Sequence, residues 1–261
     1  MRVILKLIAI LFLFGYSNTS IAQKGFFIPS ALIQPTHSEP KQFKVSLGVF
    51  RGLDLRTSYS INNRVWVFGK AATNIGTYGR KWMGDDEFKS VRNDNSFSLG
   101  VGFFNKTTSD FYFENSIGLS LTKTDNFKRY YSESISFTGK PSSGGYSSVQ
   151  TNTNYWGAFY QFTGLLIIDD LEIGLASRFV YNRYTNFAYN HSKNLDNGFV
   201  GNNFSVYSVE PVGILSYNLN KYKISAQTGL AVGIPDNNSS QTFINLIGRL
   251  SLQYSFNSKN K

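Results

Sequence analysis

The chain has 261 residues, of which 16% are aromatic and none is cysteine, and its formal net charge is +10 at pH 7. The lack of cysteine excludes disulfides, cysteine-bound zinc, a thiol nucleophile and lipidation at an N-terminal cysteine. A basic chain can bind nucleic acid or an acidic lipid surface, and in an exported protein we expect lipid and no nucleic acid.

Residues 1–22 are predicted to be a cleaved signal peptide. Arg2 and Lys6 precede an apolar run that ends at Phe14, and Ser20-Ile21-Ala22 then has the small-x-small pattern of a cleavage site. A membrane-spanning helix needs roughly 20 residues, more than this run contains, so an uncleaved anchor is the lesser alternative. No later apolar run approaches that length, which excludes a helical inner-membrane protein.

Residues 23–42 contain three prolines, Pro29, Pro35 and Pro40. Because proline cannot donate a hydrogen bond to a sheet ladder, we expect a periplasmic lead-in or a packed plug segment here, not a strand. His37 lies in this segment, and we expect it to be solvated.

From residue 43 onward, apolar and polar residues alternate with period two, as in strands that have two different faces. Leu53, Leu55 and Tyr59, for example, alternate with Asp54, Arg56 and Ser58. A tight turn at Arg51-Gly52 gives an even strand count, which a single-chain bacterial barrel requires. The predicted strands span 43–50, 53–61, 64–76, 95–104, 111–122, 154–168, 171–186, 204–218, 222–233 and 242–256.

The strands are too long for a soluble sandwich, whose strands usually have about 5 or 6 residues. Short turns such as Asp169-Asp170 alternate with long polar segments, Gly76–Asp94, Lys123–Thr153 and Phe187–Asn203, which we expect to be external loops. The sequence therefore predicts an all-β, closed antiparallel transmembrane β-barrel of about ten strands over residues 43–261, located in the outer membrane. Eight and twelve strands are the alternatives.

Several short motifs resemble a family of outer-membrane β-barrel proteins of unknown function from Gram-negative bacteria. They are Phe26-Phe27-Ile28-Pro29 with Pro35, the run from Tyr155 to Gln161, the run from Ala176 to Tyr181, and Glu210-Pro211. The resemblance covers most of the mature chain and implies a barrel and an outer-membrane location, but no activity. Several relatives begin at a lipidated cysteine, which this chain lacks.

If apolar residues face lipid, the opposite face of each strand points into the barrel lumen. The polar residues predicted to form a luminal network are Arg56, Glu114, Gln161, Glu172, Arg178, Glu210 and Arg249, with Lys44, Lys223 and Gln253 nearby. A barrel of this size is about filled by its side chains, so buried charges should pair and close the lumen. A narrow polar pathway for small solutes is the alternative. Arg178 and Glu210 are candidate partners.

No catalytic, metal or cofactor site is expected. His191 precedes Asp196 in one expected loop, and Asp85, Asp86 and Glu87 lie in another. Such residues at the barrel mouth could activate water as in omptin proteases, but their spacing does not require it. No Gly-x-Ser-x-Gly elbow, EF-hand loop or phosphate-binding glycine motif is present.

We therefore expect a non-enzymatic envelope protein, with a solute channel or carrier second and an omptin-like protease third. Aromatic residues in the expected loops, including Tyr78, Trp82 and Tyr130, could contact lipopolysaccharide, a glycan or a protein. Aromatics at the strand ends, such as Tyr155, Trp156, Tyr184 and Tyr217, are expected to form an interfacial girdle. The oligomeric state is not predicted by these patterns.

Overall fold

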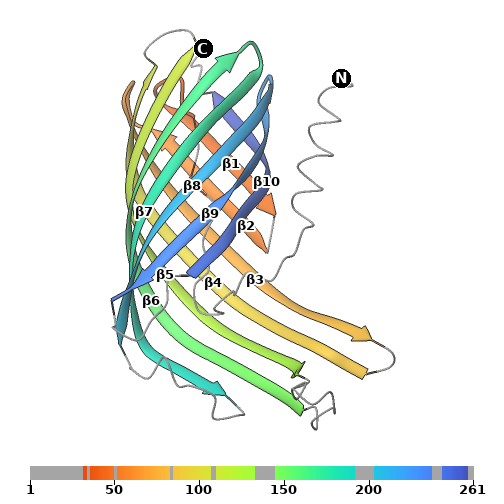
Figure 1. Cartoon of the computed structure of the whole chain (residues 1–261). Helices are drawn as coiled ribbons and strands as arrows, with labels where there is room; N and C mark the ends of the chain where they lie inside the picture. Colours follow the sequence, from red (N-terminus) through yellow and green to blue (C-terminus); the bar gives the residue numbers. More distant parts are fainter. Residues whose placement is uncertain are drawn as a thin grey trace.

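The computed structural model describes residues 32–33, 36–49, 52–82, 85–106, 110–132, 145–191, 203–236 and 243–257. These residues form ten strands that close into a barrel (Figure 1). The strands are β1 (Gln42–Val49), β2 (Leu53–Ser60), β3 (Val65–Trp82), β4 (Asp85–Lys106), β5 (Phe111–Ser132), β6 (Gly145–Ile168), β7 (Leu171–His191), β8 (Phe204–Leu219), β9 (Tyr222–Pro235) and β10 (Phe243–Asn257).

Each strand pairs with its sequence neighbours in antiparallel fashion, and β1 pairs with β10 to close the sheet. Val49 lies opposite Leu53, so β1 and β2 are two separate antiparallel strands and the described residues form the ten strands predicted. Arg51, at the predicted turn between them, lies outside the described residues. The all-β, closed antiparallel barrel predicted from the sequence is thus confirmed. None of the described residues forms a helix long and apolar enough to cross a membrane.

One end of the barrel, the short-turn end, carries the tight connections between β6 and β7 and between β8 and β9. These turns place Asp169 and Asn220 in the left-handed region, with φ of 53° and 55°. Asp and Asn tolerate that region better than most residues, so the turns predicted near these positions have a local cause. At this end the predicted strand boundaries agree with the structure to within two residues.

At the opposite end, the sequence prediction was wrong about the polar segments. Most of 76–94 and 123–153, and residues 187–191, lie in strands rather than in loops. β6 alone has 24 residues, or about 80 Å at roughly 3.3 Å per residue, whereas a bilayer core is about 30 Å thick. The hairpins β3–β4 and β5–β6 therefore project beyond the rest of the wall (Figure 1). We call the parts of β3 to β7 that extend beyond the rest of the wall, within residues 76–94, 123–153 and 187–191, the projecting hairpins.

The outer face of the barrel is apolar over a band of limited height. Leu175 is 73% exposed and Leu119 is 64% exposed, as expected for side chains that point away from the lumen. On β8 the band runs from Tyr207 to Tyr217, ten residues apart, or about 25 Å in height for a strand tilted by about 40°. That is the height of the apolar band of outer-membrane barrels. Farther along β3 toward the projecting end, the hydroxyl of Thr73 donates to Oδ1 of Asn95 on β4 at 2.9 Å.

Aromatic rings fill part of the interior on the side of β3 to β6. Trp66, Phe68 and Phe159 are buried. The ring centroid of Phe68 lies 5.1 Å from that of Trp66 and 6.1 Å from that of Phe159. Glycines on the neighbouring strands make room for them: a Cβ on Gly102 would lie 2.1 Å from the indole of Trp66. Tyr155 and Tyr184 also face inward and are buried, so the prediction that they join an interfacial girdle was wrong.

Candidate functional site

The lumen holds the polar residues predicted to lie there. All seven are buried, with relative exposures of 1% to 6%: Arg56, Glu114, Gln161, Glu172, Arg178, Glu210 and Arg249. Lys44, Lys223 and Gln253 are each 5% exposed. Residues of the same chemistry that escaped the sequence prediction include Asp54 and Lys70. The apolar–polar alternation of β2 and β3 already placed the side chains of these two residues on the luminal face.

The end of the lead-in reaches these luminal side chains. The backbone N–H of Leu32 donates to Oε1 of Gln227, and that of Ile33 donates to Oε1 of Gln161, both at 3.1 Å. The carbonyl of Leu32 accepts from Nη1 of Arg56, and the carbonyl of Ile33 accepts from Nε2 of Gln161. These partners stand on β2, β6 and β9, so the segment contacts well-separated parts of the wall. Residues 1–31, which include the expected signal peptide, lie outside the described residues.

A first group of charges surrounds Thr36. Its N–H donates to Oε2 of Glu114 at 3.3 Å, its carbonyl accepts from Nζ of Lys44 at 2.6 Å, and its hydroxyl contacts Nζ of Lys223. Thr36 has a φ of 47°, which is unfavourable for a β-branched residue. Three polar contacts to three different strands hold it in that conformation.

The same group contains a buried ion pair between Lys223 and Glu172. Nζ of Lys223 lies 2.6 Å from Oε1 of Glu172, whose carboxylate also accepts from the Asn218 amide at 2.9 Å. Tyr112 donates its hydroxyl proton to Oε2 of Glu114 at 2.9 Å. Two lysines thus face two glutamates around Thr36, and the charges of this group balance.

His37 is fully buried beside this group, so the prediction of a solvated histidine was wrong. Its Nε2 lies 3.0 Å from Oγ of Ser58 and its Nδ1 lies 3.3 Å from Oε1 of Gln42. Trp66 and Phe104 face its ring. Burial, together with the nearby positive charges of Lys44 and Lys223, lowers the pKa of His37 from 6.5 to about 3. The ring is therefore neutral at physiological pH.

A second group, which we call the cation group, begins where Arg56 meets Leu32. Its members are Asp54, Arg56, Lys70, Arg178, Glu210 and Arg249. Asp54 bridges two arginines, with Oδ1 2.7 Å from Nε of Arg56 and 2.8 Å from Nη2 of Arg249. On the other side of the lumen, where β7 and β8 pair, Nε of Arg178 donates to Oε2 of Glu210 at 2.7 Å. The sequence named this last pair as candidate partners.

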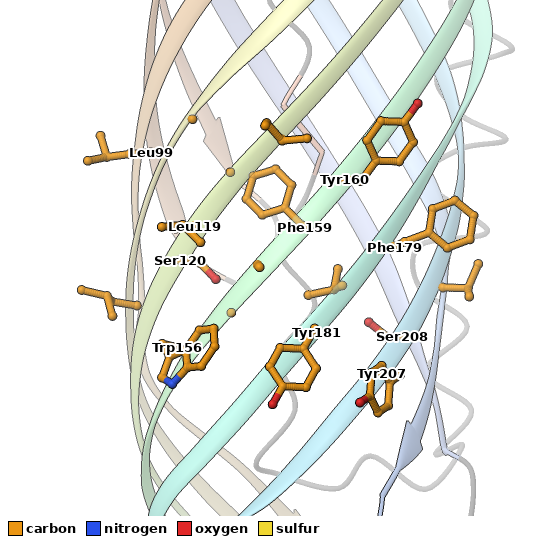
Figure 2. Close-up of a pocket in the computed structure, with 18 of the residues that line it drawn as sticks. Leu99, Leu119, Ser120, Trp156, Phe159, Tyr160, Phe179, Tyr181, Tyr207 and Ser208 are labelled. Carbon is orange, nitrogen blue, oxygen red and sulfur yellow. The ribbon is translucent and has the colours of Figure 1, made fainter.

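The outer face carries a shallow apolar hollow of about 1250 Å³ over β4 to β9. Its lining includes Leu99, Leu119, Trp156, Tyr160, Phe179 and Tyr207 (Figure 2). Trp156, Tyr181 and Tyr207 form a row in which neighbouring ring centroids lie 5.6 Å and 5.3 Å apart. Aromatic residues at this height are typical of the interface between lipid chains and headgroups.

The candidate catalytic residues are not assembled by the described structure. Asp85, Asp86 and Glu87 begin β4 instead of lying in a loop, His191 ends β7, and Asp196 lies outside the described residues. Tyr78, Trp82 and Tyr130 likewise lie in strands. Among the residues that the structure describes, no group of three His, Asp or Glu side chains could hold a metal ion.

Comparison with known proteins identifies the fold but no sequence family. No family model and no curated protein sequence matches the chain. The outer membrane protease OmpT from Escherichia coli has a similar structure, with a TM-score of 0.51 and 11% identity over 82% of this chain and 93% of that chain. The NanC porin aligns with a TM-score of 0.29 and 11% identity over 81% of this chain and 98% of that chain.

The likeness to OmpT agrees with the closed barrel fold of this chain. At 11% identity the likeness to OmpT concerns the fold alone. The resemblance to a family of unknown function has no sequence match behind it.

Proposed function

We propose that this protein is a non-enzymatic component of the outer membrane of a Gram-negative bacterium, with a lumen closed by its own side chains. Its projecting hairpins would then bind a partner at the cell surface, such as lipopolysaccharide, a glycan or a protein. The short-turn end would face the periplasm, because short turns and both ends of the chain belong on that side.

The observation that carries this proposal is the position of the lead-in. Leu32, Ile33, Thr36 and His37 are buried and bonded to side chains of β1, β2, β5, β6 and β9. A chain segment with partners around the wall leaves little cross-section for solutes in a ten-stranded barrel. Buried aromatic rings on β3 to β6 occupy further space.

Single-channel conductance of the refolded mature protein in a planar bilayer tests the closed lumen. We expect a folded barrel without discrete current steps, with folding verified by heat-modifiable gel mobility. The double variant Gln161→Ala/Gln227→Ala removes the acceptors of the Leu32 and Ile33 amides, and we expect transient openings from it. Asn182→Ala, another buried luminal amide, is the matched control and should stay silent. Stable, reproducible steps from the unmodified protein would refute the closed lumen and favour solute passage.

The absence of catalysis needs its own measurement, because the fold also occurs in a protease. Folded protein in detergent should not cleave a library of fluorogenic peptides above the rate of a heat-unfolded sample. Cleavage that His191→Ala abolished, while folding remained intact, would make the protein an enzyme and overturn this part of the proposal.

A further inference from the structure

The apolar hollow on the outer face has a small side chain at its floor. Trp156 and Tyr160 project outward from β6 (Figure 2), and Ala158 lies between them on the same face of the strand. Strand register places Ala158 opposite Leu119 on β5 and opposite Tyr181 on β7. A methyl group among four larger side chains leaves a depression that opens away from the lumen, toward the lipid.

The hollow is wide enough for several hydrocarbon chains. Its lining comes from six consecutive strands, β4 to β9. Neighbouring strands lie about 4.8 Å apart, so the hollow extends over about 24 Å of the wall. Acyl chains that lie in such a depression gain dispersion contacts that a flat or convex wall does not offer.

An arginine lies at the rim of the hollow nearest the projecting hairpins. Arg183 is directly opposite Trp156 in the register and two residues beyond Tyr181 along β7. Nη1 of Arg183 donates to Oγ of Ser205 at 3.0 Å, and the hydroxyl of Tyr181 lies 3.2 Å from the same oxygen. This shared contact places the guanidinium group beside the polar end of a side chain that lines the hollow.

Arg183 keeps donors for a ligand. Its ion-pair partner Asp236 is 3.9 Å away, and both side chains are partly exposed. Pairs of this kind contribute at most about 1 kcal/mol. Among the described residues, Nη1 is the only guanidinium nitrogen of Arg183 with a hydrogen-bond partner. Its Nε and Nη2 are therefore available to a phosphate group, which guanidinium binds through paired N–H donors.

A second cation lies at the same rim. Lys123 on β5 is exposed and lies two residues beyond Leu121, which lines the hollow. Lys123 is opposite Asn154 on β6, so the two cations lie on either side of β6, two strand spacings or about 10 Å apart across the sheet. The next outward residue of β5, Asp125, lies farther from the hollow than Lys123.

We propose that the hollow binds the acyl chains of a phosphorylated glycolipid, and that Arg183 and Lys123 bind its phosphate groups. This is the chemistry of lipid A, the lipid anchor of lipopolysaccharide. Several acyl chains match the width of the hollow, and two separated cations match a headgroup that carries phosphate at more than one position. The inference rests on the proposed function for the orientation of the barrel, which places this rim in the external leaflet.

Native mass spectrometry of the folded mature protein in detergent, with rising concentrations of purified lipid A, measures this binding. We expect one lipid A molecule to stay bound to each barrel. Arg183→Gln should raise the lipid concentration at half-occupancy about five- to ten-fold, because a charged hydrogen-bond contact is lost. Ala158→Trp fills the floor of the hollow and keeps both cations, and it should raise the same concentration by a similar factor.

Two matched variants control for general effects of charge and size. Arg64→Gln removes an exposed arginine of the connection between β2 and β3, and Leu47→Trp enlarges an outward side chain on β1, outside the hollow. Both should bind lipid A as the unmodified protein does. Heat-modifiable gel mobility verifies that every variant is folded.

Other lipids identify the chemistry of the ligand. Dephosphorylated lipid A and phosphatidylglycerol should each bind at least about five-fold more weakly than lipid A. Equal binding of phosphatidylglycerol would refute the assignment to a glycolipid, and unchanged binding in Arg183→Gln or Ala158→Trp would refute the site. The closed lumen is tested separately by conductance, so a failure of lipid binding and a failure of the proposed function are distinguishable.

Discussion

Arg178 and Glu210 lie directly opposite each other on β7 and β8, and Nε of Arg178 donates to Oε2 of Glu210 at 2.7 Å inside the lumen. Both side chains are almost completely buried, so solvent screens their attraction very little. The two residues thus form a buried cross-strand ion pair in which each side chain neutralises the charge of the other.

Removal of either partner should destabilise the barrel strongly, because it leaves the other charge buried and uncompensated. We expect about 3–5 kcal/mol for Arg178→Ala or Glu210→Ala, and a double variant that costs much less than the sum. Equilibrium urea unfolding monitored by gel mobility measures the free energy of unfolding of the two single variants and the double variant.

The matched control is the exposed pair Arg183 and Asp236, whose atoms are 3.9 Å apart with about 37% exposure on each side chain. Its coupling should be at most about 1 kcal/mol. Additive effects at Arg178 and Glu210 would contradict the pairing.

Gly102 and Gly69 test the packing of rings inside the barrel. A Cβ on Gly102 would meet Trp66 at 2.1 Å, whereas on Gly69 the nearest atom would be 3.5 Å away. We expect Gly102→Ala to cost about 1–3 kcal/mol through overpacking and Gly69→Ala to lie within about 0.5 kcal/mol of the unmodified protein. Unfolding midpoints in urea make the comparison, and equal values for the two variants would show that the ring of Trp66 is not fixed.

Leu175 and Ile75 test the extent of the apolar band. Both are highly exposed, at 73% and 71%. Leu175 lies opposite Gly213, within the β8 band from Tyr207 to Tyr217, whereas Ile75 lies farther along β3, next to the start of the projecting hairpins. In lipid vesicles, Leu175→Arg should cost about 2–4 kcal/mol and Ile75→Arg about 0–1 kcal/mol. Folding efficiency and urea midpoints in vesicles provide the measurement. If the order were reversed, the band would be misplaced along the barrel axis.

His37 should make the inserted lead-in sensitive to acid. Its pKa falls from 6.5 to about 3 on burial, so a lead-in released into solvent takes up a proton in this range while the inserted one does not. Stability of the inserted state is therefore lost as the pH falls below about 6.5, by up to about 1.4 kcal/mol per pH unit.

The control for this effect is His37→Gln, which does not titrate at the position. Gln42 and Ser58, whose side chains lie within hydrogen-bond distance of the ring, do not titrate in this range. The thermal midpoint of the unmodified protein should fall relative to that of His37→Gln between neutral pH and about pH 4. Parallel curves would mean that the ring is protonated, or solvated, in the folded protein.

The sequence by itself determined the closed barrel class, a count of about ten strands and the side-chain direction of most residues in the apolar band, because one face of each strand meets lipid and the other meets the lumen. Apolar and polar residues therefore alternate along each strand with a period of two. Leu53 and Leu55 lie on the outer face and Arg56 on the luminal face of β2. The sequence also determined the turn at Asp169-Asp170, where the residues themselves favour the turn conformation. The luminal placement of Arg178 and Glu210 follows from the same alternation.

Tertiary structure alone decided the rest, for two physical reasons. Beyond the band the sequence has polar residues on both faces of a strand, so the apolar–polar alternation disappears. Residues such as Asp85 and Lys123 were therefore predicted to lie in loops, although they lie in β4 and β5. Contacts across the lumen depend on closure of the sheet: Asp54 and Arg249 are 195 residues apart in sequence. Only the closed barrel brings them together, leaves Arg56 with an open donor and surrounds His37 with apolar rings.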